Sequence, residues 1–178
     1  MAKSICDFTF KQISPLESSI LKEGTFIWIL HASKIPPHIG ISSDGYYFSL
    51  KAKGKDLEVP VNKVLEVLHK RKIQSVFVEI KAHIELENIR LIFDGFSHAF
   101  GDTTCLFPLK KVLNASEQVE KIADLLRFLE QNQKLGSVFG LHLEKDFEGI
   151  PFYTVEQIKS RIEFLNHVEG KKHLPESR

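Results

Sequence analysis

The sequence predicts an α+β fold in which an antiparallel sheet is packed by helices. The first observation is the alternation of apolar and polar residues over residues 38–51, centred on Asp44-Gly45, which is typical of a β-hairpin. The second is a helical stripe that follows Cys105 and consists of Leu106, Leu109, Val112 and Leu113. A chain of 178 residues that are 43% hydrophobic can bury a substantial core. We therefore expect one domain over residues 1–170 and a loose polar tail over residues 171–178.

The balance of charged residues gives no support to two classes of partner, nucleic acids and anionic membranes. With 24 basic and 23 acidic residues, the formal net charge is +1, so electrostatics gives no reason to expect nucleic acid or an anionic membrane as the partner. Two basic clusters, at residues 51–55 and 69–72, are interpreted as solvated surface. No apolar run approaches the roughly 20 residues of a membrane helix, and the first residues lack a secretory signal. Because the chain has 2 cysteines, we expect a reducing compartment and a cytoplasmic protein without a membrane span.

Local turn and capping chemistry predicts the first elements. Residues 14–17 read Ser-Pro-Leu-Glu, which is typical of a helix start, and Gly24 would end that short helix. Residues 26–30 are continuously apolar, which predicts a strand that is buried on both faces. The hairpin follows, and its Asp44-Gly45 turn is expected to be type I′, because that turn needs a positive φ at both central positions.

The two-residue turn fixes the register of the hairpin. Residue 43 pairs with 46, 41 with 48, 40 with 49 and 38 with 51. One face then carries the apolar side chains of Ile39, Ile41, Phe48 and Leu50, and we expect it to face the core. The other, more polar face carries His38, Gly40, Ser42, Tyr47, Ser49 and Lys51. This register places His38 beside a glycine that leaves room for another group to approach.

The remaining segments alternate between strands and helices. Strands are expected over residues 56–59, 74–80 and 139–143, the last of them half-buried. Helices are expected from about residue 61, over the apolar stripe of residues 86–96, from about residue 105, and after a break at 114–116 to about residue 133. Pro108 must lie in the first turn of the Cys105 helix. A capping box, Thr154-Val-Glu-Gln157, opens a last helix that runs to about residue 166.

Cys105 and His38 are the strongest candidates for chemistry. A helix start stabilises a thiolate through its free N–H groups and its positive dipole end, so we expect Cys105 to have a lowered pKa. A neighbouring imidazole can take the thiol proton and later return it to a leaving group. The alternative is that Cys105 is a small buried hydrophobic residue, as many lone cysteines are.

Other candidates are weaker. His31 ends a strand and is interpreted as a structural histidine, and Cys6 is interpreted as structural because no helix start or base is near it. His98 lies seven residues before Cys105 and is a substitute base if its loop folds back. The chain has neither clustered ligand spacings such as CxxC, HxH or HExxH nor a phosphate loop that ends in Lys-Ser/Thr. We therefore expect no metal and no cofactor.

Four segments, taken in order, carry a family resemblance. They are the strand 24–28 (Gly-Thr-Phe-Ile-Trp), the run 37–41 (Pro-His-Ile-Gly-Ile) with its hairpin, the segment 57–65 (Leu-Glu-Val-Pro-Val-Asn-Lys-Val-Leu), and residues 101–105 (Gly-Asp-Thr-Thr-Cys) before Leu-Phe-Pro-Leu. This order resembles the circularly permuted NlpC-type superfamily, which includes lecithin:retinol acyltransferase-like and YiiX-like papain-fold proteins. The resemblance covers roughly residues 20–113 and implies a papain-like antiparallel sheet packed by helices.

The resemblance also implies roles for three residues. Cys105 takes the place of the nucleophile and His38 that of the base. Family members carry a third polar residue, often a histidine, on the return strand of the hairpin, and Ser49 falls on that position. A serine orients an imidazole more weakly than a carboxylate or a second histidine does. Two further departures are Thr25, where the family usually has an aspartate, and Thr104, where an asparagine often precedes the cysteine.

Three classes of function stay open. The first is a cysteine hydrolase (peptidase or amidase) or acyl-transferring enzyme that acts on a peptide, amide, thioester or lipid-ester substrate. The second is a catalytically inactive papain-like binding domain, which Ser49 and Thr25 favour. The third is an unrelated α+β interaction module in which Cys105 belongs to the core. In the first class, we expect Cys105 and His38 to lie within hydrogen-bond reach.

Overall fold

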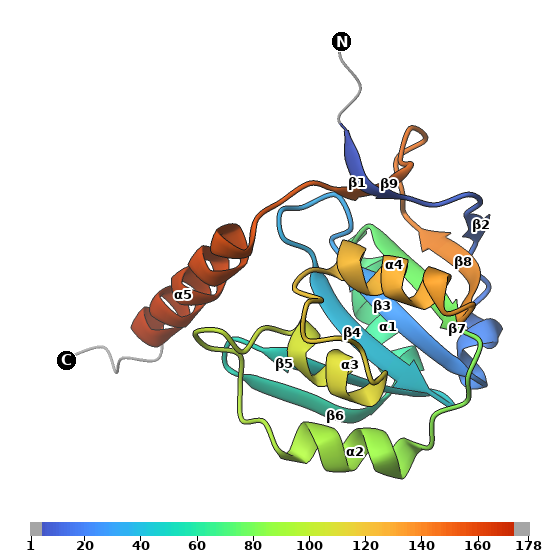
Figure 1. Ribbon diagram of the computed structural model, residues 1–178. Coiled ribbons are helices and arrows are strands. Elements are labelled where there is room, and N and C mark those ends of the chain that lie inside the picture. Colours follow the sequence, from blue (N-terminus) through green and yellow to red (C-terminus); the bar gives the residue numbers. More distant parts are fainter. Residues whose placement is uncertain (1–4, 173–178) are drawn as a thin grey trace.

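A computed structural model describes residues 5–172, with side chains as far as residue 168. The fold is α+β, as the sequence predicts. It has a seven-stranded sheet in the order β2-β8-β7-β3-β4-β5-β6 and a separate pair, β1-β9 (Figure 1). Only the β2–β8 pair is parallel among these described strands. The strands are β1 (Cys6–Thr9), β2 (Ser14–Pro15), β3 (Thr25–Leu30), β4 (His38–Ser43), β5 (Tyr46–Lys51), β6 (Gly54–Pro60), β7 (Ser75–Ile80), β8 (Leu135–Leu141) and β9 (Gly149–Pro151).

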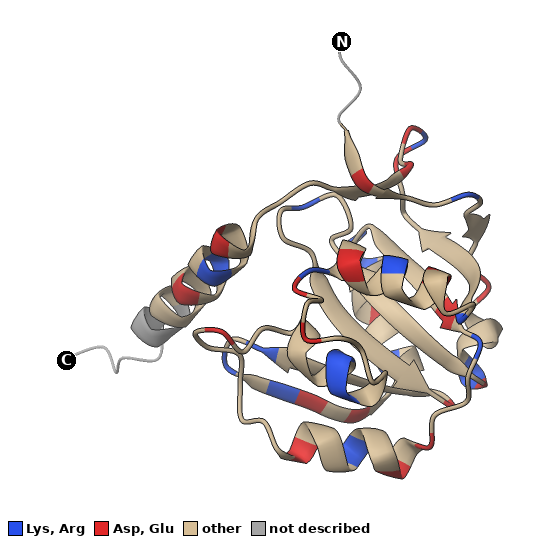
Figure 2. Ribbon diagram, in the orientation of Figure 1, with Lys and Arg blue, Asp and Glu red and all other residues tan. Residues whose placement is uncertain are grey.

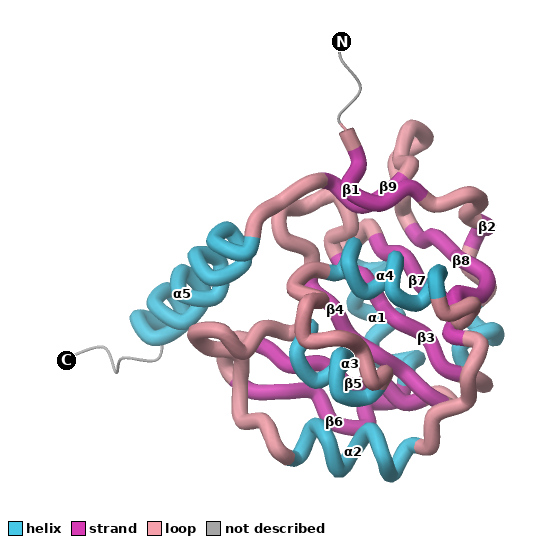
Figure 3. The backbone as a smooth tube through the Cα atoms, viewed as in Figure 1, coloured by secondary structure: helices cyan, strands magenta, loops and turns pink. Residues whose placement is uncertain are grey.

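Helices cover both faces of the large sheet (Figure 3). They are the 3₁₀ helix η1 (Ser18–Lys22), α1 (Val61–Lys70), α2 (Leu86–Asp94), α3 (Leu106–Val112), α4 (Ile122–Gln131) and α5 (Val155–Lys172). η1 and α1 form a smaller core with Trp28 and Phe77 on one face. α2, α3 and α4 form a larger core on the other face, to which α5 contributes Ile158 and Ile162. Every residue of β3 is buried between the two layers, which confirms the strand that the continuous apolar run predicts.

The hairpin has the predicted register. Gly40 pairs with Ser49 and Ile41 with Phe48, and the turn residues Asp44 and Gly45 have φ angles of 48° and 87°. The apolar face is at most 2% exposed and belongs to the larger core; it comprises Ile39, Ile41, Phe48 and Leu50. The predicted turn and core face are therefore confirmed.

The more polar face of the hairpin is buried as well. Trp28 Nε1 donates a 2.8 Å hydrogen bond to Ser42 Oγ, which satisfies both groups inside the smaller core. Tyr47 is 1% exposed, and its ring lies over Gly40, where an added Cβ would be only 2.4 Å from the ring and its hydroxyl. The prediction that Gly40 leaves room for another group to approach is wrong, because Tyr47 already fills that space.

Two helix boundaries differ from the sequence prediction. Ser14 does not cap a helix, because Ser14 and Pro15 pair in parallel with β8, and η1 begins only at Ser18. The helix expected after residues 114–116 begins later, at Ile122, where the Asp124 carboxylate accepts a 3.1 Å hydrogen bond from the N–H of Lys121. An acidic side chain at this position stabilises the free N–H groups of a helix start.

The last helix begins where it was predicted. Gln157 Oε1 accepts a hydrogen bond of 2.8 Å from the N–H of Thr154, and Thr154 Oγ1 accepts one of 3.2 Å from the N–H of Gln157, which confirms the capping box. α5 continues to Lys172, so residues 171 and 172 of the predicted tail are helical, and residues 173–178 lie outside the described residues. Within residues 5–172, no helix is both long and apolar enough to cross a membrane.

Candidate functional site

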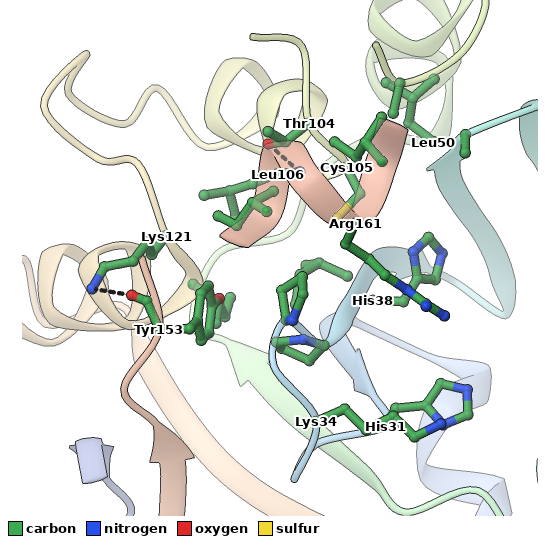
Figure 4. A pocket seen from close by; sticks show the side chains of 18 of the residues that line it. His31, Lys34, His38, Leu50, Thr104, Cys105, Leu106, Lys121, Tyr153 and Arg161 are labelled. Atoms are coloured by element: carbon green, nitrogen blue, oxygen red, sulfur yellow. Dashed lines mark hydrogen bonds between the residues drawn. The ribbon is translucent and has the colours of Figure 1, made fainter. Parts of the chain in front are cut away.

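A cavity of about 490 Å³ lies at the end of the sheet where β4 begins. Its walls come from the β3–β4 connection, the ends of β4 and β5, the segment that leads into α3, the start of α4, and α5. Both Cys105 and His38 line this cavity, and Figure 4 shows the sulfur of Cys105 directed into it. The structure therefore brings the two predicted residues, which are far apart in the sequence, to one cavity.

The start of α3 positions the thiol. Cys105 is half-buried and immediately precedes the first residue of α3, as the sequence predicts. Thr104 Oγ1 accepts a 3.3 Å hydrogen bond from the N–H of Leu106, which holds this first turn. The backbone N–H groups of Ile39, Cys105 and Leu106 are directed at the thiol. Since the pairing of β4 with β5 begins at Gly40, the N–H of Ile39 lies just beyond that ladder and beside α3.

The direction of the Cys105 pKa differs from the prediction. Burial raises the pKa of the Cys105 thiol above its ordinary value, although the three N–H groups directed at it act in the opposite sense. The helix start was expected to lower this pKa. Loss of hydration outweighs the backbone dipoles here, because a thiolate loses its water shell in a largely apolar cavity. At neutral pH the sulfur therefore carries its proton.

Cys105 and His38 reach the cavity from opposite faces of the sheet. Cys105 packs against the larger core together with Ile39, whereas His38 pairs with Leu30, which belongs to the smaller core. His38 is the first residue of β4, so its side chain lies at the end of the sheet and still lines the cavity. Among the described residues, no hydrogen bond joins the thiol to the imidazole. Their catalytic pairing stays a prediction.

His38 is neutral at physiological pH. Burial lowers the pKa of its imidazole to about 4; Asp56 acts in the opposite direction, and Lys51 and His31 add to the lowering. A neutral imidazole can accept a proton, which is what a general base requires. Within the part of the chain that the structure describes, no hydrogen bond holds the His38 ring.

Among the described residues, no hydrogen bond joins Ser49 to His38. It is fully buried, pairs with Gly40, and its Oγ donates a 3.0 Å hydrogen bond to Oδ2 of Asp56. Lys51 Nζ donates a second 3.0 Å hydrogen bond to Oδ1 of the same carboxylate. The sequence places Asp56 only at the start of a strand expected over residues 56–59, and its position as the acidic neighbour of His38 was missed. Asp56 is a carboxylate, which is the kind of group that orients an imidazole strongly.

Three other candidate residues, His31, His98 and Cys6, lie at different places in the structure. His31 lines the cavity and adopts a positive φ of 55°, and its interpretation as a structural histidine stays a prediction. His98 is not among the lining residues; its Nδ1 lies 2.9 Å from Ser97 Oγ and its ring packs on Phe100. Cys6 lies in β1 and is half-buried. His31 therefore joins the candidate site, and His98 loses its support as a substitute base.

Comparison with known proteins leaves the family open. No family model, no curated protein and no solved structure matches this chain. Among residues 5–172, no group of three or more His, Cys, Asp or Glu side chains is arranged to hold a metal ion.

Proposed function

We propose that this chain is a papain-like cysteine hydrolase or acyl-transferring enzyme, with Cys105 as the nucleophile and His38 as the base. The observation that carries the proposal is that both side chains line one cavity, with backbone N–H groups directed at the sulfur. The papain-like assignment is supported by the order of the motifs along residues 20–113 and by the position of Cys105 before a helix that packs against β4.

The chemistry follows from the protonation states. Because the thiol is protonated and the imidazole is neutral, the thiol proton must move to His38 as the sulfur attacks the carbonyl carbon of the substrate. His38 then protonates the leaving alcohol, thiol or amine, and a thioester to Cys105 remains. Water or a second acceptor then attacks this thioester and gives its proton to His38. As the acyl product leaves, His38 returns this proton to the sulfur and the thiol is restored. For these proton transfers, the imidazole must come within hydrogen-bond reach of the sulfur.

Two features would assist the reaction. The backbone N–H of Ile39 or of Cys105 can donate to the oxygen that becomes negative during attack, since both are already directed at the sulfur. Asp56 stabilises the protonated imidazole, because its negative charge raises the pKa of His38. We therefore assign Asp56 a positioning and electrostatic role, supported by the hydrogen bond from Ser49.

One observation favours a second candidate, a ligand-binding domain without catalysis. The thiol and the imidazole are neutral, approach from opposite faces, and share no hydrogen bond among the described residues. A protein of this kind would bind the same acyl compounds in the cavity without forming a covalent bond to Cys105. The two candidates differ only in whether an acyl-enzyme forms.

Intact-protein mass spectrometry with 4-nitrophenyl esters of four to twelve carbons tests the proposal. We expect the acyl group to add to the wild-type protein and to be lost again over time. Cys105→Ala should remove the adduct, and His38→Gln should slow its formation by about 10²-fold or more. The matched control is Cys6→Ser, which removes the cysteine outside the cavity, keeps Cys105, and should behave as wild type. Binding without an adduct would support the inactive domain instead.

A further inference from the structure

Three basic side chains gather at one side of the cavity. His31 and Lys34 come from the β3–β4 connection, and Arg161 comes from α5. Figure 4 shows Arg161 extended toward the side of the cavity where His31 and His38 lie. Lys34 and Arg161 are both close enough to His31 to lower its pKa. Two segments more than 100 residues apart thus bring two cations, Lys34 and Arg161, together beside the imidazole of His31.

Within residues 5–168, Lys34 and Arg161 have no counter-ion. Among the described residues, no carboxylate forms an ion pair with Lys34 or Arg161, and both of these cations lower the His31 pKa. The other basic residues of the cavity wall differ, because Lys51 pairs with Asp56 and Lys121 with Asp7. Clustered like charges repel one another unless an anion lies between them.

The acidic residues nearby face other partners. Glu120, the carboxylate among the lining residues, lies on the α4 side and close enough to Lys159 to raise its pKa. Acidic and basic segments alternate along α5 (Figure 2), and Glu156 also acts on Lys159. Lys159 itself pairs with Asp102 at 2.6 Å. The positive charge beside His31 is therefore left for something that enters the cavity.

The rest of the cavity is largely apolar. Most of its other walls consist of hydrophobic side chains: Ile35, Leu50, Leu106, Ile122, Ile158 and Ile162. A cavity with an apolar body and one cluster of cations suits a compound with a hydrocarbon part and an anionic group at one end. Carboxylates and phosphates are the oxyanions that lysine and arginine bind with charge-assisted hydrogen bonds.

We propose that His31, Lys34 and Arg161 form an oxyanion-binding subsite, which holds the carboxylate or phosphate group of a ligand whose apolar part fills the cavity beside Cys105. As the means of orienting an acyl substrate, the subsite rests on the proposed function. As a binding site it stands on its own, because recognition of the anion requires no chemistry at the sulfur.

Calorimetric titration with three ligands of equal chain length tests this subsite. Octanoate carries a carboxylate, octyl phosphate carries a phosphate, and octanamide is the neutral counterpart. We expect at least one anionic ligand to bind wild-type protein about tenfold more tightly than octanamide, with the preference shrinking at high salt. The anion that binds more tightly shows whether the subsite prefers a carboxylate or a phosphate.

Variants locate the subsite. Lys34→Gln and Arg161→Gln should each weaken binding of the anionic ligand about threefold and leave octanamide binding unchanged. The matched control is Arg71→Gln, at the exposed end of α1, which should leave all three affinities unchanged. Equal affinities for charged and neutral ligands in wild-type protein, or a preference that survives in both cavity variants, overturns the subsite. If wild-type protein forms no acyl-enzyme in the mass-spectrometry experiment but still prefers the anionic ligands, the proposed enzyme function is wrong and the subsite stands.

Discussion

Ser49 Oγ donates a 3.0 Å hydrogen bond to Oδ2 of Asp56. The two residues pair across β5 and β6, and the carboxylate also accepts a hydrogen bond from Lys51 Nζ. Through this carboxylate, the serine on the return strand of the hairpin acts on His38 indirectly, because Asp56 raises the imidazole pKa. A serine that would orient an imidazole weakly by itself instead supports a carboxylate.

Charge changes at this group should move the His38 pKa in known directions. In Asp56→Asn the imidazole loses its favourable neighbour, so its pKa should fall below the wild-type value of about 4. In Lys51→Met an unfavourable cation is lost, so the pKa should rise. Titration of the histidine ring protons by NMR, assigned with His38→Gln, measures both. Shifts in the reverse directions, or none, would show that Asp56 and Lys51 do not act on His38.

Stability should fall as the pH is lowered below about 6.5. The unfolded His38 binds a proton at its ordinary pKa of 6.5, whereas the folded imidazole resists protonation until about pH 4, so the stabilisation is complete above 6.5 and is lost between those values. The loss is on the order of 3 kcal/mol. Urea unfolding from pH 7.5 to 4.5 measures it.

Two variants separate this effect from general acid destabilisation. His38→Gln should reduce the slope, with the remainder coming partly from His31, whose pKa is also lowered by burial and by Lys34 and Arg161. His98→Gln, outside the cavity, should keep the wild-type slope. If all three proteins lose stability in parallel, His38 is not the group responsible.

The buried face of the hairpin should not accept a charge. Ile41 is 0% exposed within the larger core, so Ile41→Asp should destabilise the protein by about 4 kcal/mol or more, or prevent folding. Leu57→Asp is the control, since Leu57 lies on β6 and is 37% exposed. Urea unfolding of both variants gives the comparison, and equal stabilities would contradict the observed register.

The contact between Gly40 and Tyr47 can be tested by a double-mutant cycle. Gly40→Ala adds a Cβ that would lie 2.4 Å from the Tyr47 ring, and we expect a loss of about 2 kcal/mol. In a Tyr47→Val background the added methyl group has space, so the same change should cost less. Additive effects in the cycle would place the strain elsewhere.

Thiol reactivity should follow the burial of Cys105. In the Cys6→Ser background, alkylation of Cys105 by iodoacetamide should begin only above the ordinary thiol pKa of about 8.5, because burial raises the Cys105 pKa. Peptide mass mapping over pH 6–10 gives the profile. Rapid labelling at pH 6 would mean that the helix start dominates after all.

The hairpin shows how far the sequence alone could be interpreted. Asp44-Gly45 dictates a two-residue turn, and from it the partner of every residue near Gly40 follows. The stripe after Cys105 likewise predicts α3, because Pro108 restricts where that helix can begin. Both predictions depend on neighbours within a few residues, which is the range over which such patterns act.

Asp56 could not be found in the same way. β6 contains an irregularity between the partners of Tyr47 and Ser49, at which Glu58 adopts a positive φ of 48°. In an unbroken ladder, counting from the Tyr47–Val59 pair would put Leu57 opposite Ser49. The extra residue brings Asp56 opposite Ser49 instead, and no local sequence motif predicts this shift. Similarly, the Cys105 pKa depends on how much water the folded cavity admits, which the position of a helix start does not encode.

The two halves of the cavity are made at different times during translation. His38 and Cys105 have both left the ribosome before residues 155–165, which supply Ile158, Arg161 and Ile162, have been synthesised. A nascent chain that reaches only β9 therefore exposes its thiol and imidazole without the α5 wall. Both groups become sheltered only when the final helix folds against the body.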